Sequence, residues 1–271
     1  MDRKKLLAGL ALGLASITAL AGAATNLTAV VETEPETKAE VKQDAKAIEI
    51  MDAFVAKIGG KELIESIEST KVTASMTIPM AGMNAKMTIM NKTPGKMMMV
   101  MEMPGFGKQE TGYDGTHGWS SDPLQGPRLM SKEEVDAIEE QADPAAQVKF
   151  RELYPTIAYK GETTFEGKKA HHIHLIDKDG DESNHYYSVD SGMLIGTKGI
   201  QPSQMGDLEI TTVLSDYKEF GGMQMATKMV QKFGPQEVII TIDSVEVNSV
   251  DDSVFAPPAA IKALIDAKKS D

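Results

Sequence analysis

The sequence predicts an α+β protein, mainly β, organised around an antiparallel sheet. From Ser69 onward, apolar residues recur at every second position in segments separated by Pro, Gly and Asp, which is the pattern of half-buried strands. Helical spacing of apolar residues is confined to the stretch before Ser69, to residues 131–154 and to the C-terminal end. We therefore expect two meanders of strands, with helices at three places in the chain.

The composition favours one main domain and excludes several partners. The 271 residues are 41% hydrophobic and 5% aromatic, enough for one substantial core, and all-β domains often reach this size undivided. A net charge of −12 makes the chain a poor candidate for binding nucleic acid or an anionic membrane surface. The absence of Cys excludes disulfides, thiol chemistry and a lipidated N-terminal Cys.

Residues 1–23 have the features of a secretory signal peptide. A basic start is followed by an apolar run from Leu6 to about Leu20 and by small residues at Ala19, Ala21 and Ala23. We expect the mature chain to begin near Gly22 or Thr25. The alternative is an uncleaved membrane anchor, although the apolar run is shorter than the roughly 20 residues of a spanning helix.

An acidic tether and a helix come next. Residues 24–43 are rich in Thr, Glu, Lys and Ala and too polar to bury a face, so we expect a flexible tether. The segment DAKAIEIMDAFVAKIGG then has helical apolar spacing and ends at Gly59-Gly60, and a short helical turn follows it. The apolar positions of this helix are Ile48, Met51, Val55 and Ile58.

Strands alternate with turns from residue 69 to residue 122 and again from residue 156 to residue 247. Turn signals such as Pro94-Gly95 and Asp114-Gly115 separate the first set. Between the two sets, Ser131 and Glu134 have the spacing of a capping box, so we expect helix within residues 131–154. The C-terminal tail, residues 259–271, could form one or two amphipathic turns through Ile261, Leu264 and Ile265.

Methionine is concentrated on one face of two neighbouring strands. In KMMMVMEM, successive side chains point to opposite faces, so one face carries methionine alone. Methionine is flexible and polarizable, and it is common on surfaces that accept variable apolar partners. The alternative is an ordinary packed core. The residues on this face are Met97, Met99, Met101 and Met103, and on the preceding strand Met83, Ala85, Met87 and Ile89.

We expect no metal, no cofactor and no enzymatic activity. His172 and His174 share a strand face, and a zinc site with His185 across the hairpin is conceivable, but the polar face of a hairpin is normally solvated. Copper bound by thioethers is a second possibility, but the methionine run has no bracketing His. Catalytic motifs such as Gly-x-Ser-x-Gly, a phosphate-binding glycine loop or His-Glu-x-x-His are absent.

The order of these segments is similar to that of the LolA-like family of outer membrane lipoprotein-sorting proteins. The resemblance covers about Ala45 to Pro258. Its specific parts are YDGTHGW, the VDSGML hairpin, the SDYKEFGGM hairpin and the terminal DDSVFAPP.

The resemblance implies a curved antiparallel sheet, an unclosed half-barrel of about eleven strands covered by helices as a lid, over residues 44–258. It further implies a periplasmic protein, expected to be monomeric, that holds acyl chains of a lipid or lipoprotein in an apolar hollow. A ligand-free envelope interaction protein, recruited by its surface or its tether, is the alternative. The sorting carriers use an Arg on an early strand to hold the lid shut, whereas the strands from Ser69 to Met103 contain no Arg, only Lys71, Lys86, Lys92 and Lys96. The expected ligand-binding residues are Met76, Ile78, Met87, Ile89, Met97, Met99, Met101 and Trp119.

Overall fold

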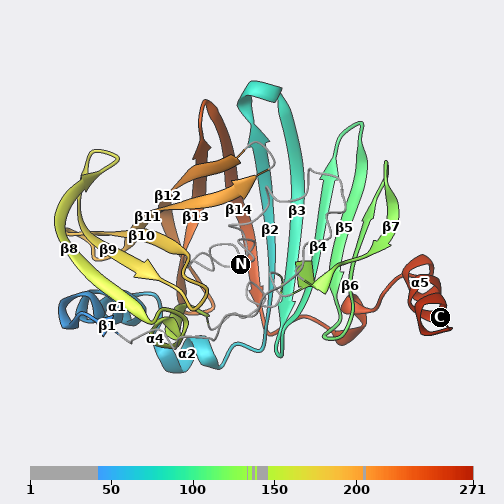
Figure 1. Cartoon of the computed structure of the whole chain (residues 1–271), viewed down its shortest axis with the longest axis horizontal. Helices are drawn as coiled ribbons and strands as arrows, with labels where there is room; N and C mark the ends of the chain where they lie inside the picture. The colour runs from blue at the N-terminus through green and yellow to red at the C-terminus, as the bar shows by residue number, and fades with distance from the viewer. Residues whose placement is uncertain (1–41, 133, 136–137, 139–145, 204–205, 271) are drawn as a thin grey trace, which may run out of the picture.

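The computed structural model describes residues 42–132, 134–135, 138, 146–203 and 206–270 (Figure 1). The expected signal peptide and nearly all of the expected tether lie outside the described residues. No helix in the described ranges is long and apolar enough to cross a bilayer.

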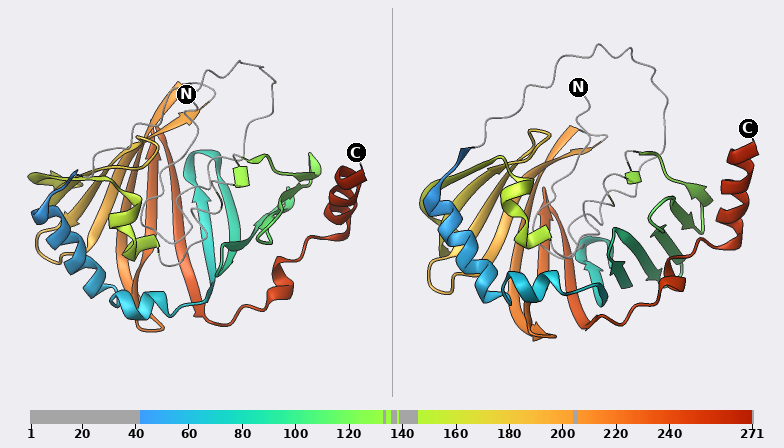
Figure 2. Two further views of the ribbon diagram at one scale, coloured as in Figure 1. Left: turned by 60° about the horizontal axis from the view of Figure 1, so that its bottom comes forward. Right: turned by 90° about the horizontal axis from the view of Figure 1, so that it is seen from below.

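One curved sheet of fourteen strands forms the body of the protein, in the order β1-β8-β9-β10-β11-β12-β13-β14-β2-β3-β4-β5-β6-β7 (Figures 1 and 2). Every neighbouring pair is antiparallel except the two-residue β1, which runs parallel to β8. The strands are β1 (Lys42–Gln43), β2 (Ser69–Ile78), β3 (Met83–Lys92), β4 (Lys96–Met103), β5 (Gly107–Tyr113), β6 (Gly118–Asp122), β7 (Gly126–Leu129), β8 (Thr156–Phe165), β9 (Lys168–Ile176), β10 (Glu182–Ser188), β11 (Leu194–Ser203), β12 (Gly206–Phe220), β13 (Met223–Phe233) and β14 (Gln236–Val247).

This sheet confirms the predicted fold class, an unclosed antiparallel half-barrel, and it has more strands than the eleven expected. Lys42 and Gln43, the last two residues of the expected tether, form β1. The Gln43 side chain donates to the carbonyl oxygens of Arg151 and Tyr154 at 2.8 and 3.0 Å. These bonds fasten the start of the described chain to the short helix, Phe150–Leu153, that precedes β8.

Local irregularities accompany the curvature of the sheet. At a β-bulge, two residues of one strand lie opposite a single residue of the neighbouring strand, and the bulged strand bends more strongly. Two glycines permit close packing: a side chain at Gly112 would meet the Trp119 ring at 2.4 Å, and one at Gly196 would meet the Phe165 ring at 2.4 Å. The register shifts lie at Tyr159/Gly161, Tyr186/Tyr187 and Ile242/Ser244.

Helices α1 (Ala45–Lys57), α2 (Lys61–Glu65) and α4 (Phe150–Leu153) pack against the end of the sheet that contains β8 to β13. Asp44 begins α1, because its carboxylate accepts from the backbone N–H of Lys46 at 2.9 Å. Phe54 of α1 lies edge-on to Tyr187 of β10, with ring centroids 5.4 Å apart. Removing a buried phenyl ring of this kind typically costs about 3–5 kcal/mol of stability. The buried residues of α1 are Ala47, Ile50, Met51, Phe54 and Val55.

The capping box expected at Ser131 is present. The Glu134 carboxylate accepts from the Ser131 backbone N–H at 2.8 Å, and the Ser131 hydroxyl accepts from the Glu134 backbone N–H at 3.3 Å. Most of the helical segment expected after it lies outside the described residues. Where the description resumes, the chain forms a 3-10 turn, Ala146–Val148, and then α4.

The C-terminal residues form α5 (Ala259–Ser270), where one or two turns of a tail were expected. Ile261 and Ile265 are buried with Trp119 and Phe255, so this helix is part of the folded body. A 3-10 turn, Asp252–Phe255, precedes it. Lys96 donates to the Asp252 carboxylate at 2.9 Å, which anchors this turn to β4.

Candidate functional site

The sheet has two faces with different partners. The concave face carries the largest apolar cluster, which includes Ala74, Met87 and Ile240 and also the buried residues of α1. The convex face carries Met98 and Trp119 beneath α5, and a separate cluster around Tyr186. Figure 2 shows α5 and the chain leading to it outside the curve of the sheet. The concave face is the candidate site, because curvature gives it the shape of a trough.

Seven of the eight expected ligand-binding residues share this concave face. Strand register places Met87 opposite Met101 and Ala74, Ile89 opposite Met99, and Met76 opposite Ala85. Met87 and Ile89 are 1% and 2% exposed, whereas Met99 is only partly buried. Met97 belongs to a smaller cluster with Tyr113 and Ile138, and Met99 contacts both clusters. The seven residues are Met76, Ile78, Met87, Ile89, Met97, Met99 and Met101.

Trp119 does not belong to this group, and its assignment to the hollow is wrong. Register places Trp119 opposite Gly112, and Gly112 opposite Met98, so the indole shares the convex face with Met98. Its ring fills the space over Gly112 and is covered by α5 and by Phe255. Alternation within one strand does not reveal which residues of the next strand point to the same face, because the length of the turn between the strands decides this.

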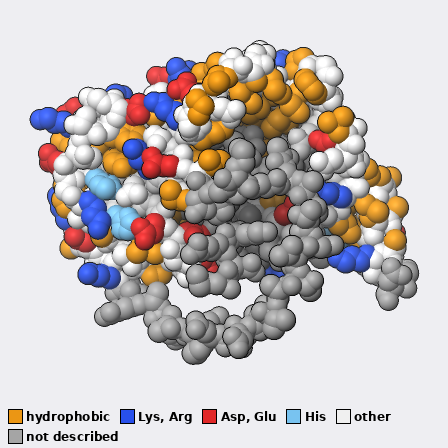
Figure 3. Space-filling model, turned by 45° about the horizontal axis from the view of Figure 1, so that its top comes forward, with side chains coloured by type: hydrophobic (Ala, Val, Ile, Leu, Met, Phe, Trp, Pro, Cys, Tyr) orange, Lys and Arg blue, Asp and Glu red, His pale blue; other side chains and the backbone are white. Residues whose placement is uncertain are grey.

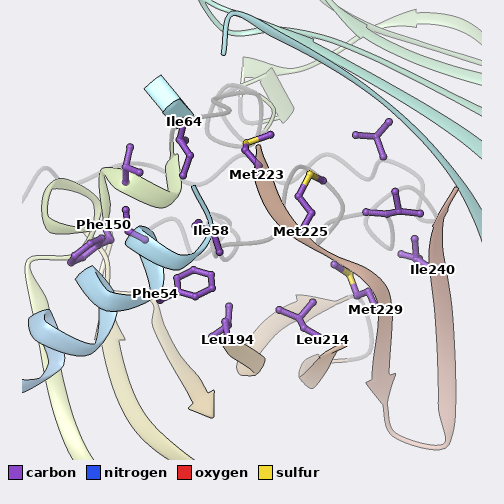
Figure 4. Packing of buried hydrophobic residues seen from close by; sticks show 14 of the residues in the cluster. Phe54, Ile58, Ile64, Phe150, Leu194, Leu214, Met223, Met225, Met229 and Ile240 are labelled. Carbon is purple, nitrogen blue, oxygen red and sulfur yellow. The ribbon is translucent and has the colours of Figure 1, made fainter. Parts of the chain in front are cut away.

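The sequence reasoning missed a second group of methionines, on β13. Met223, Met225 and Met229 are buried in the concave cluster, and Met229 lies opposite Ile240, which in turn lies opposite Met76. Figure 4 shows Met225, Met229, Leu214 and Ile240 pointing into the same interior as Phe54 and Leu194. The signal was available in MQMATKM, which has the same period of two. The methionine wall, defined as the concave methionines of β2, β3, β4 and β13, therefore spans the middle of the trough.

Polar side chains interrupt the concave face on both sides of the methionine wall. Ser183, His185 and Tyr187 of β10 are buried on one side. Thr70 and Asn91 are buried at the ends of β2 and β3, within the wall, and Thr111 of β5 is buried beyond it. Burial lowers the pKa of His185 to about 3 and raises that of Tyr187 well above its usual value. Both side chains are therefore neutral at physiological pH.

The histidine hairpin does not assemble the conceivable three-His site. His172 lies opposite Tyr186 and His174 opposite Asn184, whereas His185 lies opposite Ile173 on the other face. The Asn184 side-chain oxygen is within hydrogen-bond distance of His172 and His174, at 2.7 and 3.3 Å. Within the described part of the chain, no group of three His, Asp or Glu side chains is arranged to hold a metal ion.

An arginine does contact the segment that follows β7, although no arginine lies on the early strands. Arg128 forms two parallel hydrogen bonds with the Glu134 carboxylate, at 2.7 and 2.9 Å. This pairing lowers the pKa of Glu134. Val135 and Ile138 follow and pack with Met97 and Tyr113 over the concave face of β4 and β5. The pair fixes the start of the segment that covers this part of the trough.

A groove of about 330 Å³ lies beside this segment, between the start of β6 and α5. Gly118, Met130 and Val135 contribute its apolar wall. Lys132 and Lys268 also line it.

Three hairpin turns at one end of the sheet expose large apolar side chains. Met80 in the β2–β3 turn, Phe106 in the β4–β5 turn and Leu124 in the β6–β7 turn are 67%, 60% and 88% exposed. Figure 3, which brings the upper end of Figure 1 forward, shows apolar side chains gathered along this rim. Exposed apolar residues grouped in this way often mark a contact surface.

No known family model matches the sequence. No curated protein matches it either. Solved structures do share its architecture. A DUF1329 family protein from Desulfovibrio piger is 13% identical, with a TM-score of 0.55, and the match covers 78% of this chain and 97% of that one.

Two further structures support the same comparison. One, described as an outer membrane lipoprotein-sorting protein domain from Vibrio parahaemolyticus, is 12% identical, with a TM-score of 0.51 over 78% of this chain and 96% of that one. The other, a LolA superfamily protein from Nitrosomonas europaea, is 12% identical, with a TM-score of 0.52 over 76% of this chain and 96% of that one. Identities this low establish a shared fold and nothing further. The protein has the LolA-like fold, an unclosed antiparallel half-barrel with helices packed against it.

Proposed function

We propose that the protein is a periplasmic, non-enzymatic carrier that holds an acyl chain of a lipid or lipoprotein against its concave face. The observation that carries this proposal is the methionine wall, to which β2, β3, β4 and β13 all contribute. A packed core usually relies on branched side chains with well-defined rotamers, and methionine specifies such a core poorly. A wall of thioethers instead adapts to a flexible apolar ligand.

Native mass spectrometry of the purified protein tests this proposal. We expect a fraction of molecules to carry a co-purifying lipid, released on denaturation and identified in the organic extract. A Met99→Glu variant should lose the lipid and remain folded. Wild-type protein that is free of lipid, and that binds no acyl probe after delipidation, would contradict the proposal.

The alternative function, a ligand-free interaction protein, is favoured by one observation, the exposed apolar turns at Met80, Phe106 and Leu124. If these turns dock a partner protein, a photo-reactive residue at position 106 should yield one discrete cross-linked product in cells. That product should disappear when Met80 and Leu124 are changed to Ser, while lipid content stays unchanged. Lack of any discrete product would remove this alternative.

A further inference from the structure

Three residues of β10 bury polar atoms that have no partner. Ser183, His185 and Tyr187 occupy alternate positions and are 3%, 0% and 0% exposed. The Ser183 hydroxyl, both His185 ring nitrogens and the Tyr187 hydroxyl form no hydrogen bond with any described residue. Burying a polar group without a partner is costly, and such groups are rare in native proteins. Several of them on one strand face therefore call for a bound partner.

The side chains around these three residues are mostly apolar and carry no fixed charge. On the same face, Ile173 and Leu175 of β9 lie opposite His185 and Ser183, and Thr197 of β11 lies opposite His185. Two aromatic rings approach from the helices. Tyr154, which follows α4, has its ring centroid 6.2 Å from that of His185, and Phe54 lies 5.4 Å from Tyr187.

The titratable side chains that adjoin the three residues are Tyr154, Tyr217 and His171. His171 lies opposite Tyr187 on β9, and its Nδ1 is 3.1 Å from the Tyr159 hydroxyl. Burial also keeps the His185 imidazole neutral. Ser183, His185 and Tyr187 therefore offer neutral donors and acceptors of hydrogen bonds, without a cation to balance an anionic group.

The distance from Ser183, His185 and Tyr187 to the methionine wall matches the length of an acyl chain. Five inter-strand steps separate β10 from β2, which corresponds to roughly 24 Å along the sheet. This is the length scale of one long fatty acyl chain. Leu194, Leu214 and Met229 belong to the single apolar cluster that connects the two regions (Figure 4).

We propose that Ser183, His185 and Tyr187 bind the uncharged ester or hydroxyl group of a glycerol lipid whose acyl chain lies along the methionine wall. This inference rests on the proposed lipid-binding function and defines the ligand class more narrowly. Ester carbonyls accept hydrogen bonds, and glycerol hydroxyls donate and accept them, so they match these side chains. A carboxylate or phosphate placed here would be a buried charge without a counter-ion.

The test compares ligands that differ at the polar end. The delipidated mature protein is titrated with dioleoylglycerol, a diacylglyceryl-cysteine peptide, oleate and hexadecane. We expect the two glycerol esters to bind more tightly than oleate. If both glycerol esters bind, the ratio of their affinities identifies the preferred source of the ester. Tighter binding of dioleoylglycerol indicates a free lipid, and tighter binding of the diacylglyceryl-cysteine peptide indicates a lipoprotein anchor.

Variants then test the three residues directly. Ser183→Ala, His185→Phe and Tyr187→Phe should each weaken binding of the glycerol esters about tenfold, the equivalent of one lost hydrogen bond. Hexadecane binding should not change. The midpoint of thermal unfolding without ligand should stay the same or rise, because the deleted atoms have no partner in the free protein.

Tyr186→Phe is the matched control, since Tyr186 precedes Tyr187 on the same strand but faces the convex side. It should leave the affinities unchanged. Equal ester affinity in wild type and all three variants would overturn the inference while leaving the proposed function intact, as would tighter binding of oleate than of the esters. A wild type that binds none of the four ligands would overturn the proposed function and this inference together.

Discussion

A single side chain, Met99, distinguishes a ligand-binding face from a filled core. It is partly buried, and it contacts both concave apolar clusters. If this face admits water or ligand, Met99→Glu should leave the protein folded and abolish binding of an apolar fluorescent probe. In a filled core, the same change would bury an unpaired charge and remove several kcal/mol of stability. Probe titration together with urea unfolding separates these outcomes.

The control for this variant is Thr88→Glu, which introduces the same charge on the convex face of the adjacent strand. It should change neither stability nor probe binding appreciably. An unfolded Met99→Glu protein, combined with a wild type that binds no probe, would identify the methionine wall as ordinary packing.

His185 should make stability depend on pH. Its pKa is about 3 in the folded protein and about 6.5 when unfolded, so between these values the unfolded state binds more protons. Its contribution is therefore complete above pH 6.5 and is lost as the pH falls, by about 1.4 kcal/mol per pH unit. Urea unfolding from pH 7 to pH 4 should show a smaller loss of stability in His185→Phe than in wild type. Equal slopes would mean that the folded protein protonates His185 readily.

At the residue scale, periodicity predicted which methionines share a face, but it failed at Trp119, and it could not show that His185 faces away from His172 and His174. Both results have one physical origin. Alternation shows which residues of one strand point to the same face. Which face they share with residues of the next strand depends on the length of the turn between the strands and on bulges. Gly112 opposite Trp119 is the one local signal that the indole needs space on that face.

The C-terminal helix α5 is the element whose role the sequence least revealed. Its spacing of Ile261, Leu264 and Ile265 predicts one or two amphipathic turns, but its packing partners, Trp119 and Phe255, come from other parts of the fold. An isolated helix of this length is marginal in water, so its stability depends on those contacts. By contrast, the helix at residues 45–57 was predictable, because its cap, apolar face and glycine stop are all local.

Ile261→Asp should detach α5 from the sheet. Ile261 is fully buried, so the change removes an apolar contact and buries a charge unless the helix leaves. We expect the Trp119 emission to shift to longer wavelength and stability to fall by about 2–5 kcal/mol. Probe binding at the concave face should persist.

Leu264→Asp provides the comparison, because Leu264 is 38% exposed on the same helix. Its emission spectrum should match that of the wild type. A red shift in both variants would mean that general disruption, and not loss of the Ile261 contact, exposes the indole.

For the whole molecule, the fold class and the antiparallel order within each meander were predictable from the alternation and the turns. The strand count was not. The two-residue β1 has no sequence pattern of its own, and β7 consists of Gly-Pro-Arg-Leu, which lacks alternation. The contact between the two meanders was also unpredictable from local pattern, because it joins β2 to β14.

That contact between β2 and β14 has a consequence for how the chain folds. Lys71 and Glu246, 175 residues apart, form an ion pair across it, whereas the other antiparallel pairs join strands consecutive in the chain. Closing so long a loop has a high entropic cost, so we expect each meander to collapse early and the β2–β14 pairing to limit the folding rate.

The same topology makes the protein a candidate for assembly from two separate pieces. A chain divided between residues 143 and 144, outside the described residues, leaves β2 to β7 in one fragment and β8 to β14 in the other. The first fragment also carries α1, which packs on β10 of the second through Phe54 and Tyr187. Co-expressed fragments should therefore co-elute as one species, and Phe54→Ala should weaken their association. Fragments that stay apart would show that covalent continuity, and not the shared interface, holds the two halves of the trough together.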